Sequence, residues 1–256
     1  MSHLLIDIGN SFAKYAVYTA EVLATVNKVK TKSFGKMIDS IDFETFESLS
    51  EIVLVSVADD LLTKNITDKL SERFQCSVQQ VNTVESALGV KCGYADFTLL
   101  GSDRWLAIIG AFHHLKKQKI VKPVMVVDCG TVITVDVIDS LGQHLGGWMM
   151  PGTYLMSDSL IEKSNAIKQG LSHTVKNLPD ANNVFGHSTH ECVGLGCKLA
   201  EVGFIEQCYI QTQKKLKETP HCILTGGGAS DIIQMLTMNV KYLPDLIFEG
   251  LALFAE

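Results

Sequence analysis

The sequence lacks several features that would define whole classes of protein. It has no apolar run near the roughly 18 residues that a membrane span needs, and no basic segment followed by an apolar one at its N-terminus. Its seven cysteines form no Cys-x-x-Cys pair, and neither a Gly-x-Ser-x-Gly nor a His-Glu-x-x-His motif occurs. Lys and Arg number 22 against 28 Asp and Glu, which argues against a non-specific nucleic-acid binder. We therefore expect a cytoplasmic protein with reduced thiols and neither a nucleic-acid nor a membrane partner.

What is present is an ordinary globular composition, with 46% hydrophobic residues in 256, enough for one large or two small domains. Strands and amphipathic helices alternate along the chain, which predicts an α/β fold. Strands are expected at 52–57, 78–81 and 223–224, and helices at 59–75, 104–117, 153–166, 189–217 and 245–255. The clearest loop is expected at 177–183.

Two segments half a chain apart have the same pattern. Residues 4–18 and 124–138 each read as an apolar strand closed by an Asp, a glycine two residues later, a small polar residue and a second strand. The repetition predicts a duplicated architecture with its boundary near 115–123. We expect one domain over 1–117 and another over 118–256.

The two turns are candidate phosphate-binding loops. Glycine lets the backbone direct N–H groups at an anion, Asn10, Ser11 and Thr131 add hydrogen bonds, and the aspartates can hold a cation. Taken singly, each is more simply an ordinary hairpin turn, because Asp and Gly dominate such turns. Their recurrence favours the phosphate-binding interpretation.

Two further glycine-rich segments are weaker signals. Residues 225–230 follow a strand and precede a helical stretch, a place for an anion or an adenine, or simply a helix entry. Gly146 and Gly147, with Pro151 and Gly152, predict a rigid structural loop.

The sharpest single site is the segment 100–105, at the start of a predicted helix with Ser102 as its N-cap. Asp103 could accept a proton from a substrate hydroxyl while Arg104 anchors an acidic group, as in a small-molecule kinase. The simpler alternative is that Asp103 complements the helix dipole and Arg104 forms a surface ion pair. His113 and His114 are expected on a solvated helix face, and metal binding by histidine is not expected.

Taken together, the chain resembles the type III pantothenate kinases, within the superfamily of acetate and sugar kinases, actin and heat-shock chaperone ATPases. Six motifs in family order carry the resemblance over essentially the whole length. They are Asp7-Ile8-Gly9-Asn10-Ser11, Tyr94 with Leu100-Gly101-Ser102-Asp103-Arg104-Trp105, Asp128 to Thr134, Gly146 to Gly152, Thr225 to Ala229, and Phe248-Glu249-Gly250-Leu251.

The resemblance implies duplicated ribonuclease H-like (actin-like ATPase) domains, each a mixed sheet flanked by helices, with the active site in the cleft between them. It implies ATP-dependent phosphorylation of pantothenate to 4'-phosphopantothenate, the first step of coenzyme A synthesis, by a homodimer that uses Mg²⁺ and a monovalent cation, K⁺ or NH₄⁺.

The resemblance also assigns roles. Asp103 is the general base, Asp128 the monovalent-cation ligand, Thr131 a nucleotide contact, and Asp7 lies near the metal and phosphates. The remaining matches in the first phosphate loop are Ile8, Gly9, Asn10, Ser11, Phe12, Ala13 and Lys14. Substrate-binding matches are Tyr94, Gly101, Ser102, Asp103, Arg104 and Thr189, the last near the start of the helix expected to form the dimer.

This sequence departs from the family pattern at Phe97, where proline is usual, at Ala107, where asparagine is common, and at Gly228, where aspartate is usual. Two alternatives stay open. One is a non-catalytic regulator with the same fold, which would have no chemical need for all three aspartates; the other is a superfamily kinase or phosphatase acting on another small hydroxy acid or on polyphosphate.

Overall fold

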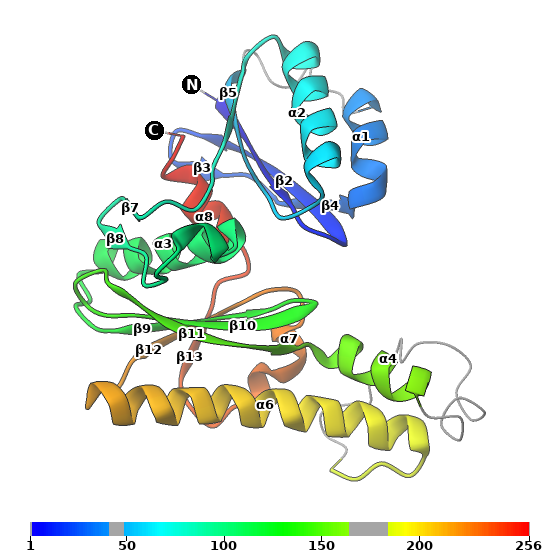
Figure 1. Cartoon of the computed structure of the whole chain (residues 1–256), viewed down its shortest axis with the longest axis vertical. Helices are drawn as coiled ribbons and strands as arrows, with labels where there is room; N and C mark the ends of the chain where they lie inside the picture. Colours follow the sequence, from blue (N-terminus) through cyan, green and yellow to red (C-terminus); the bar gives the residue numbers. More distant parts are fainter. Residues whose placement is uncertain (1, 41–48, 164–183, 256) are drawn as a thin grey trace. The chain divides into compact units, whose positions relative to one another are not determined.

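The computed structural model describes residues 2–40, 49–163 and 184–255. Its contacts divide the chain into two compact units, one of residues 1–119 with 245–256 and the other of residues 120–244 (Figure 1). The chain first passes from one unit to the other between residues 119 and 120, within a few residues of the predicted boundary. The C-terminal residues differ from the prediction, because they belong to the first unit and not to the second.

The first unit is a mixed sheet with helices on both faces. Strands β1 (Ser2–Ile8), β2 (Phe12–Thr19), β3 (Val22–Leu23), β5 (Leu49–Ser56) and β6 (Ser77–Gln80) follow the order β3-β2-β1-β5-β6, and β4 (Asn27–Lys30) pairs with β2. β1 is antiparallel to β2 and parallel to β5, and β5 is parallel to β6. The predicted strands at 52–57 and 78–81 are thus confirmed.

Alternation along β1 assigns its two faces. Leu4, Ile6 and Ile8 share a core with Phe34 and Ile38 of α1 (Thr31–Ser40), and that core includes residues of α2 (Asp60–Phe74). Leu5 and Asp7 lie on the other face. The helices α3 (Ser102–Lys117) and α8 (Leu246–Ala252) pack against each other and against β5 and β1, and their residues are not part of that core. Asp7 therefore projects on the sheet face that carries the helix of Asp103.

The C-terminal helix joins this unit through close backbone packing. A Cβ atom on Gly110 of α3 would lie 2.7 Å from the carbonyl oxygen of Leu246, and one on Gly250 would lie 2.3 Å from that of Leu106. His114 Nδ1 also lies 3.0 Å from Glu249 Oε2, so this histidine is half-buried against α8 and not on a solvated face. Glycines at the crossing let the two helices touch, which assigns 245–256 to the first unit.

The second unit repeats the strand order of the first. Strands β9 (Val124–Cys129), β10 (Val132–Ile138), β11 (His144–Pro151), β12 (His221–Thr225) and β13 (Val240–Tyr242) run in the order β11-β10-β9-β12-β13. β9 is antiparallel to β10 and parallel to β12, as β1 is to β2 and β5. The duplicated α/β architecture is confirmed by this matching topology.

Helices complete the second unit. The long α6 (Thr189–Leu216) covers the face formed by Met125, Val127 and Cys129, and α4 (Thr153–Lys163) packs on α6. Short helices α7 (Ala229–Ile232) and η2 (Ile233–Met235) follow the glycine-rich turn. The predicted extension of α4 to 166 and the predicted loop at 177–183 lie outside the described residues.

Two local predictions are wrong. Gly146 and Gly147 lie inside strand β11 and not in a loop, and Gly147 packs so closely on β10 that a Cβ atom would lie 1.8 Å from the carbonyl oxygen of Val135. Gly101, not Ser102, is the N-cap of α3. The remaining elements are β7 (Ser86–Ala87), β8 (Val90–Lys91) and η1 (Phe97–Leu99).

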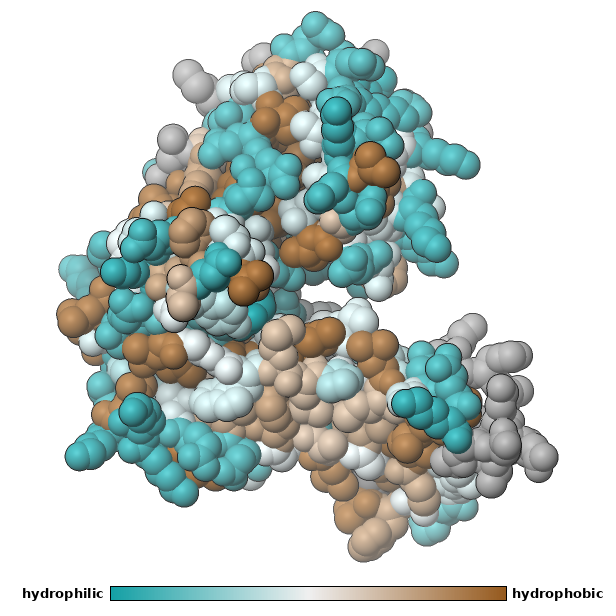
Figure 2. Space-filling view, in the orientation of Figure 1, coloured by the Kyte–Doolittle hydropathy of each residue, from teal (hydrophilic) through white to brown (hydrophobic). Residues whose placement is uncertain are grey.

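Across the described ranges, no helix combines the length and apolarity needed to cross a membrane. All seven cysteines are free thiols. Figure 2 shows that hydrophobic side chains gather over part of the second unit. In that unit, β11 and α4 expose Trp148, Met149, Tyr154, Leu155 and Leu160.

Candidate active site

The first hairpin turn, between β1 and β2, presents backbone and a charge pair. The Gly9 N–H donates to the Phe12 carbonyl oxygen at 3.0 Å, and a Cβ atom on Gly9 would lie 3.0 Å from that oxygen. Asn10, Ser11 and Phe12 are exposed, while Asp7 is 7% exposed. Register pairs Asp7 with Lys14 across the strands, and Lys14 Nζ lies 4.0 Å from Asp7 Oδ2. The turn thus has a lysine ammonium group next to its aspartate.

Thr31 fixes this turn from the start of α1. Its hydroxyl donates to the Gly9 carbonyl oxygen at 2.7 Å, and its N–H donates to the Ser11 carbonyl oxygen at 3.1 Å. Thr31 itself is buried. A further hydrogen bond next to the turn runs from the Val57 N–H to the carbonyl oxygen of Ile8, at 3.0 Å. Sequence analysis missed Thr31, because a threonine at the start of a helix gives no signal of a bond to a turn 22 residues earlier.

Asp103, Arg104 and Tyr94 form a second cluster at the N-terminus of α3. Asp103 Oδ1 accepts a hydrogen bond from the Arg104 N–H at 2.7 Å, so the carboxylate lies against the backbone of the first helical turn. A Cβ atom on Gly101 would lie 2.7 Å from Asp103 Oδ1, so glycine leaves room for that position. The helix dipole favours a carboxylate there.

Arg104 is buried rather than paired on the surface. It is 8% exposed, its Nη1 donates to the Tyr94 hydroxyl at 3.1 Å, and its guanidinium carbon lies 5.6 Å from the centre of the Tyr94 ring. Burying a guanidinium is costly unless its donors are satisfied, and a fork of N–H groups suits a carboxylate. The surface ion-pair alternative does not fit this burial.

A second missed residue, Thr83, supports the segment that leads into α3. Its hydroxyl donates to the Leu100 carbonyl oxygen at 2.7 Å, and its N–H donates to Ser102 Oγ at 3.3 Å. The side chain of Ser102 therefore ties two segments together instead of capping the helix. Nothing in the local pattern around Thr83 indicates this role, since its partners lie 17 and 19 residues away.

The second hairpin turn, between β9 and β10, is enclosed by glycines. A Cβ atom on Gly226, where φ is +90°, would lie 2.3 Å from Asp128 Oδ1 and 2.6 Å from the Cys129 nitrogen. A Cβ atom on Gly152 would lie 2.6 Å from the Gly130 carbonyl oxygen. The Gly228 N–H donates to the Cys129 carbonyl oxygen at 2.8 Å. Backbone from two distant segments therefore packs directly on this turn.

These contacts bring the glycine-rich segment 225–230 and the Asp128 turn together. The half-buried Asp128 ends β9, and Thr131 is exposed at the turn. At the family's aspartate position, a Cβ atom on Gly228 would lie 3.1 Å from the Cys129 carbonyl oxygen. The glycine at 228 thus allows a closer approach than a side chain would. The other departures are a half-buried Phe97 at the start of η1 and a buried Ala107 inside α3.

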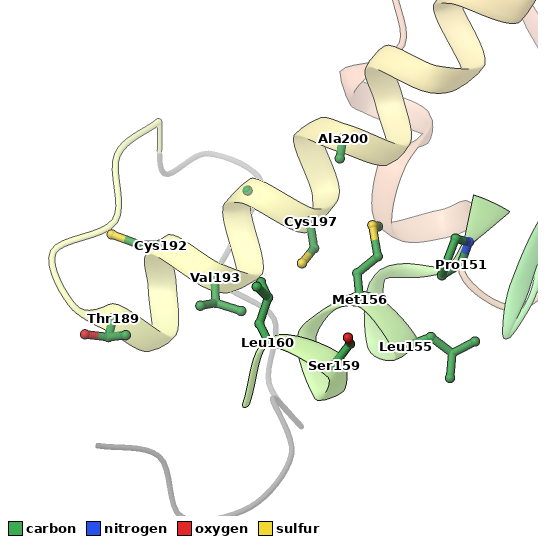
Figure 3. Close-up of a pocket in the computed structure, with 11 residues that line it drawn as sticks. Pro151, Leu155, Met156, Ser159, Leu160, Thr189, Cys192, Val193, Cys197 and Ala200 are labelled. Carbon is green, nitrogen blue, oxygen red and sulfur yellow. The ribbon is translucent and has the colours of Figure 1, made fainter. Parts of the chain in front are cut away.

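Thr189 begins α6 and is exposed. It lines a groove of about 610 Å³ between α4 and α6, which is mostly apolar and includes Met156, Leu160, Val193 and Cys197 (Figure 3). Ser188 caps the helix by accepting a hydrogen bond from the Glu191 N–H at 3.2 Å. Thr189 thus lies in the second unit, whereas the Tyr94–Arg104 cluster lies in the first.

The aspartates of the two hairpin turns offer oxygen ligands, which hard cations prefer. No cluster of three or more His, Cys, Asp or Glu side chains that could hold a metal occurs among the described residues. Asp128 Oδ1 lies directly against glycine backbone, since a Cβ atom on Gly226 would come within 2.3 Å of it. Asp7 and Asp128 are therefore candidate cation ligands.

Comparison with solved structures defines the class of fold. The chain is similar to a ROK family protein from Streptococcus pneumoniae in complex with sucrose, with a TM-score of 0.52, 16% identity and coverage of 98% of this chain and 96% of that one. It is also similar to MreB5 of Spiroplasma citri bound to ADP, with a TM-score of 0.52, 11% identity and coverage of 99% and 95%. The chain therefore shares the fold of these proteins, the actin-like ATPase fold.

Sequence comparison identifies the family within that class. Residues 3–211 match the type III pantothenate kinase family. The chain is 32% identical to a type III pantothenate kinase of Pseudomonas fluorescens, over 98% of this chain and 97% of the relative. It is 31% identical to one of Colwellia psychrerythraea, over 98% and 99%. The chain belongs to the type III pantothenate kinase family.

Proposed function

We propose that the chain transfers the γ-phosphoryl group of ATP to the primary hydroxyl of pantothenate, with Asp103 as the general base. The observation that carries this proposal is the preorganised cluster of Asp103, Arg104 and Tyr94 at the start of α3. It lies in the same unit as the first phosphate loop, on the sheet face to which Asp7 projects. Family membership supports the choice of substrate.

The acceptor side of the reaction rests on two different side chains. Arg104 binds the pantothenate carboxylate through its guanidinium fork, and Tyr94 orients that fork by accepting from Nη1. Asp103 accepts the proton of the substrate hydroxyl as that oxygen attacks the γ-phosphorus. Gly101 and Ser102 complete the proposed substrate site in the first unit, and Thr189 of the second unit is proposed as a further substrate contact.

The donor side rests on backbone and charge. Asn10 and Ser11, exposed at the first hairpin turn, present backbone N–H groups and polar side chains to the phosphates, and Lys14 adds a positive charge next to Asp7. Asp7 would lie near the Mg²⁺ that accompanies ATP, Asp128 would hold K⁺ or NH₄⁺, and Thr131 would contact the nucleotide. The two cations supply charge neutralisation near the phosphates, which together with positioning carries most of phosphoryl-transfer catalysis.

A homodimer is the proposed assembly. Support comes from the 28-residue helix α6 and from the exposed apolar side chains of the neighbouring β11 and α4. An exposed apolar surface of this kind is typical of an interaction site.

The test measures ADP release from ATP and Mg²⁺, with and without pantothenate, in K⁺ buffer and in Na⁺ buffer. We expect pantothenate-dependent turnover in K⁺ that is lost in Na⁺. Folded protein that shows no pantothenate-dependent turnover in either buffer would contradict the proposal and favour the regulatory homologue or another acceptor.

Two variants separate chemistry from binding. Asp103→Asn keeps the side-chain shape but removes the base, so we expect kcat to fall by about a thousandfold with an unchanged circular dichroism spectrum. Tyr94→Phe removes only the hydroxyl that orients Arg104, so we expect the KM for pantothenate to rise several-fold with little change in kcat. Appreciable turnover by Asp103→Asn would exclude Asp103 as the base.

A further inference from the structure

Two segments of the second unit, the end of β11 and the glycine-rich turn, are hydrogen-bonded through their backbone to the second hairpin turn. The Gly152 N–H donates to the Thr131 carbonyl oxygen at 3.0 Å, which fastens the end of β11 to the second hairpin turn. The Gly228 N–H donates to the Cys129 carbonyl oxygen at 2.8 Å, which fastens the glycine-rich turn to the same hairpin. The shape of the Asp128–Thr131 turn therefore depends on both neighbours.

A buried carboxylate lies behind this meeting point. Glu201 of α6 is 4% exposed, and its Oε2 accepts a hydrogen bond from the Thr153 hydroxyl. The backbone N–H of Thr153 also hydrogen-bonds to Glu201. Thr153 follows Gly152 directly and is the first residue of α4. Glu201 thus holds the residue next to the one that supports Thr131.

Several neighbouring groups change the pKa of Glu201. Burial raises its pKa, the Thr153 hydroxyl lowers it, Asp231 beyond the glycine-rich turn raises it, and Lys198 lowers it. The pKa of the Cys129 thiol is raised by burial and then by Glu201. A carboxylate at such a buried position is costly, and an apolar residue of similar volume would often be at least as stable. Its presence is therefore better explained by what it holds in place.

We propose that Glu201 is a positioning residue for the nucleotide, acting through Thr153 and Gly152 on the Asp128–Thr131 turn. The proposal rests on the proposed function, because it requires this turn to contact ATP. Glu201 touches neither substrate nor cation in this scheme. It sets the position of α4 and of the Thr131 carbonyl group, and so determines how well the turn is preorganised for the phosphates.

The test uses Glu201→Gln and Thr153→Val in the full-length chain. Glutamine has the size of glutamate but a single acceptor oxygen and no charge, so it cannot accept from both donors of Thr153 as strongly. We expect the KM for ATP, and the Kd for ADP measured by calorimetry, to rise about tenfold in each variant. The KM for pantothenate should stay within about twofold of the unaltered chain. Because both substitutions weaken the same hydrogen bond between the Thr153 hydroxyl and the Glu201 carboxylate, the double variant should be little weaker than either single one.

Glu206→Gln is the matched control. Glu206 lies on the same helix, and its Oε1 accepts from the Thr237 N–H at 2.9 Å and from the Thr237 hydroxyl at 2.7 Å. It makes the same kind of contact with a segment other than β11 or the hairpin, so we expect its ATP and ADP constants within about twofold of the unaltered chain.

The outcomes distinguish the two proposals. Nucleotide binding that is unchanged by Glu201→Gln, or that Glu206→Gln weakens equally, would reduce Glu201 to a structural residue and overturn this inference alone. Absence of nucleotide binding by the unaltered chain would overturn this inference together with the proposed function.

Discussion

The two hairpins share one strand pattern but differ in what surrounds their turns. In the first, register places Lys14 opposite Asp7, and the turn is fastened by Thr31 at the start of a helix. In the second, register places the neutral Thr134 opposite Asp128, and the turn is packed by Gly152, Gly226 and Gly228. The first turn has the positive charge of Lys14 next to its carboxylate, whereas the second turn is enclosed by backbone.

Under the proposed function, this difference would let the two copies serve different roles in one reaction. A lysine beside a phosphate loop supplies fixed positive charge, while a carboxylate among carbonyl groups suits a bound cation. We infer that the copies diverged through their surroundings and kept the strand–turn–strand core.

The largest difference should appear when each turn receives a methyl group. Gly226 has a φ of +90°, and Gly226→Ala places a Cβ atom 2.3 Å from Asp128 Oδ1. We therefore expect the free energy of unfolding to fall by at least about 3 kcal/mol. Gly9→Ala places one 3.0 Å from the Phe12 carbonyl oxygen, and the loss should be about 1 kcal/mol. Urea denaturation of both variants gives the comparison, and equal losses would show that enclosure does not distinguish the turns.

The next difference concerns the cation. Asp128→Asn should lower kcat by about a hundredfold and remove the advantage of K⁺ over Na⁺, because the proposed cation ligand is lost. Asp7→Asn should lower kcat as well, yet the remaining activity should still require K⁺. Rates measured over a series of K⁺ concentrations test this pair. A K⁺ requirement that survives in Asp128→Asn would place the cation elsewhere.

The smallest difference concerns the support behind the second turn. Burial raises the pKa of Glu201 from its ordinary value of 4.5, so the folded state binds this proton more tightly than the unfolded state does. The contribution of Glu201 to the free energy of unfolding is therefore fully present below pH 4.5 and is lost as the pH rises through the raised pKa. Relative to Glu201→Gln, the unaltered chain should therefore lose free energy of unfolding as the pH rises above 4.5. The facing groups are Thr153, Lys198, Asp231, Cys129 and Cys197.

Thr153→Val sharpens this measurement, because the Thr153 hydroxyl lowers the pKa of Glu201 by stabilising its charged form. Without that hydroxyl the loss of stability with rising pH should be steeper. Urea denaturation at several pH values measures both slopes. A difference between Glu201→Gln and the unaltered chain that does not change with pH would contradict the prediction.

Local sequence determined the elements whose signals are short. The two hairpins, helix α2 and the first residues of α3 follow from apolar periodicity and turn residues within about fifteen positions. The duplication was also readable, because the same strand–Asp–Gly–strand pattern occurs twice. The Asp103–Arg104 pair was predictable for the same reason, since its members are adjacent and begin a helix.

Only the tertiary structure decided what those signals meet. The C-terminal helix packs in the first unit because Gly110 and Gly250 allow two distant helices to touch. Thr31, Thr83 and Glu201 support turns to which no nearby sequence pattern connects them. A hydrogen bond between residues far apart in sequence depends on the path of the whole chain, so the sequence alone determined which turns exist, and the fold determined what holds them.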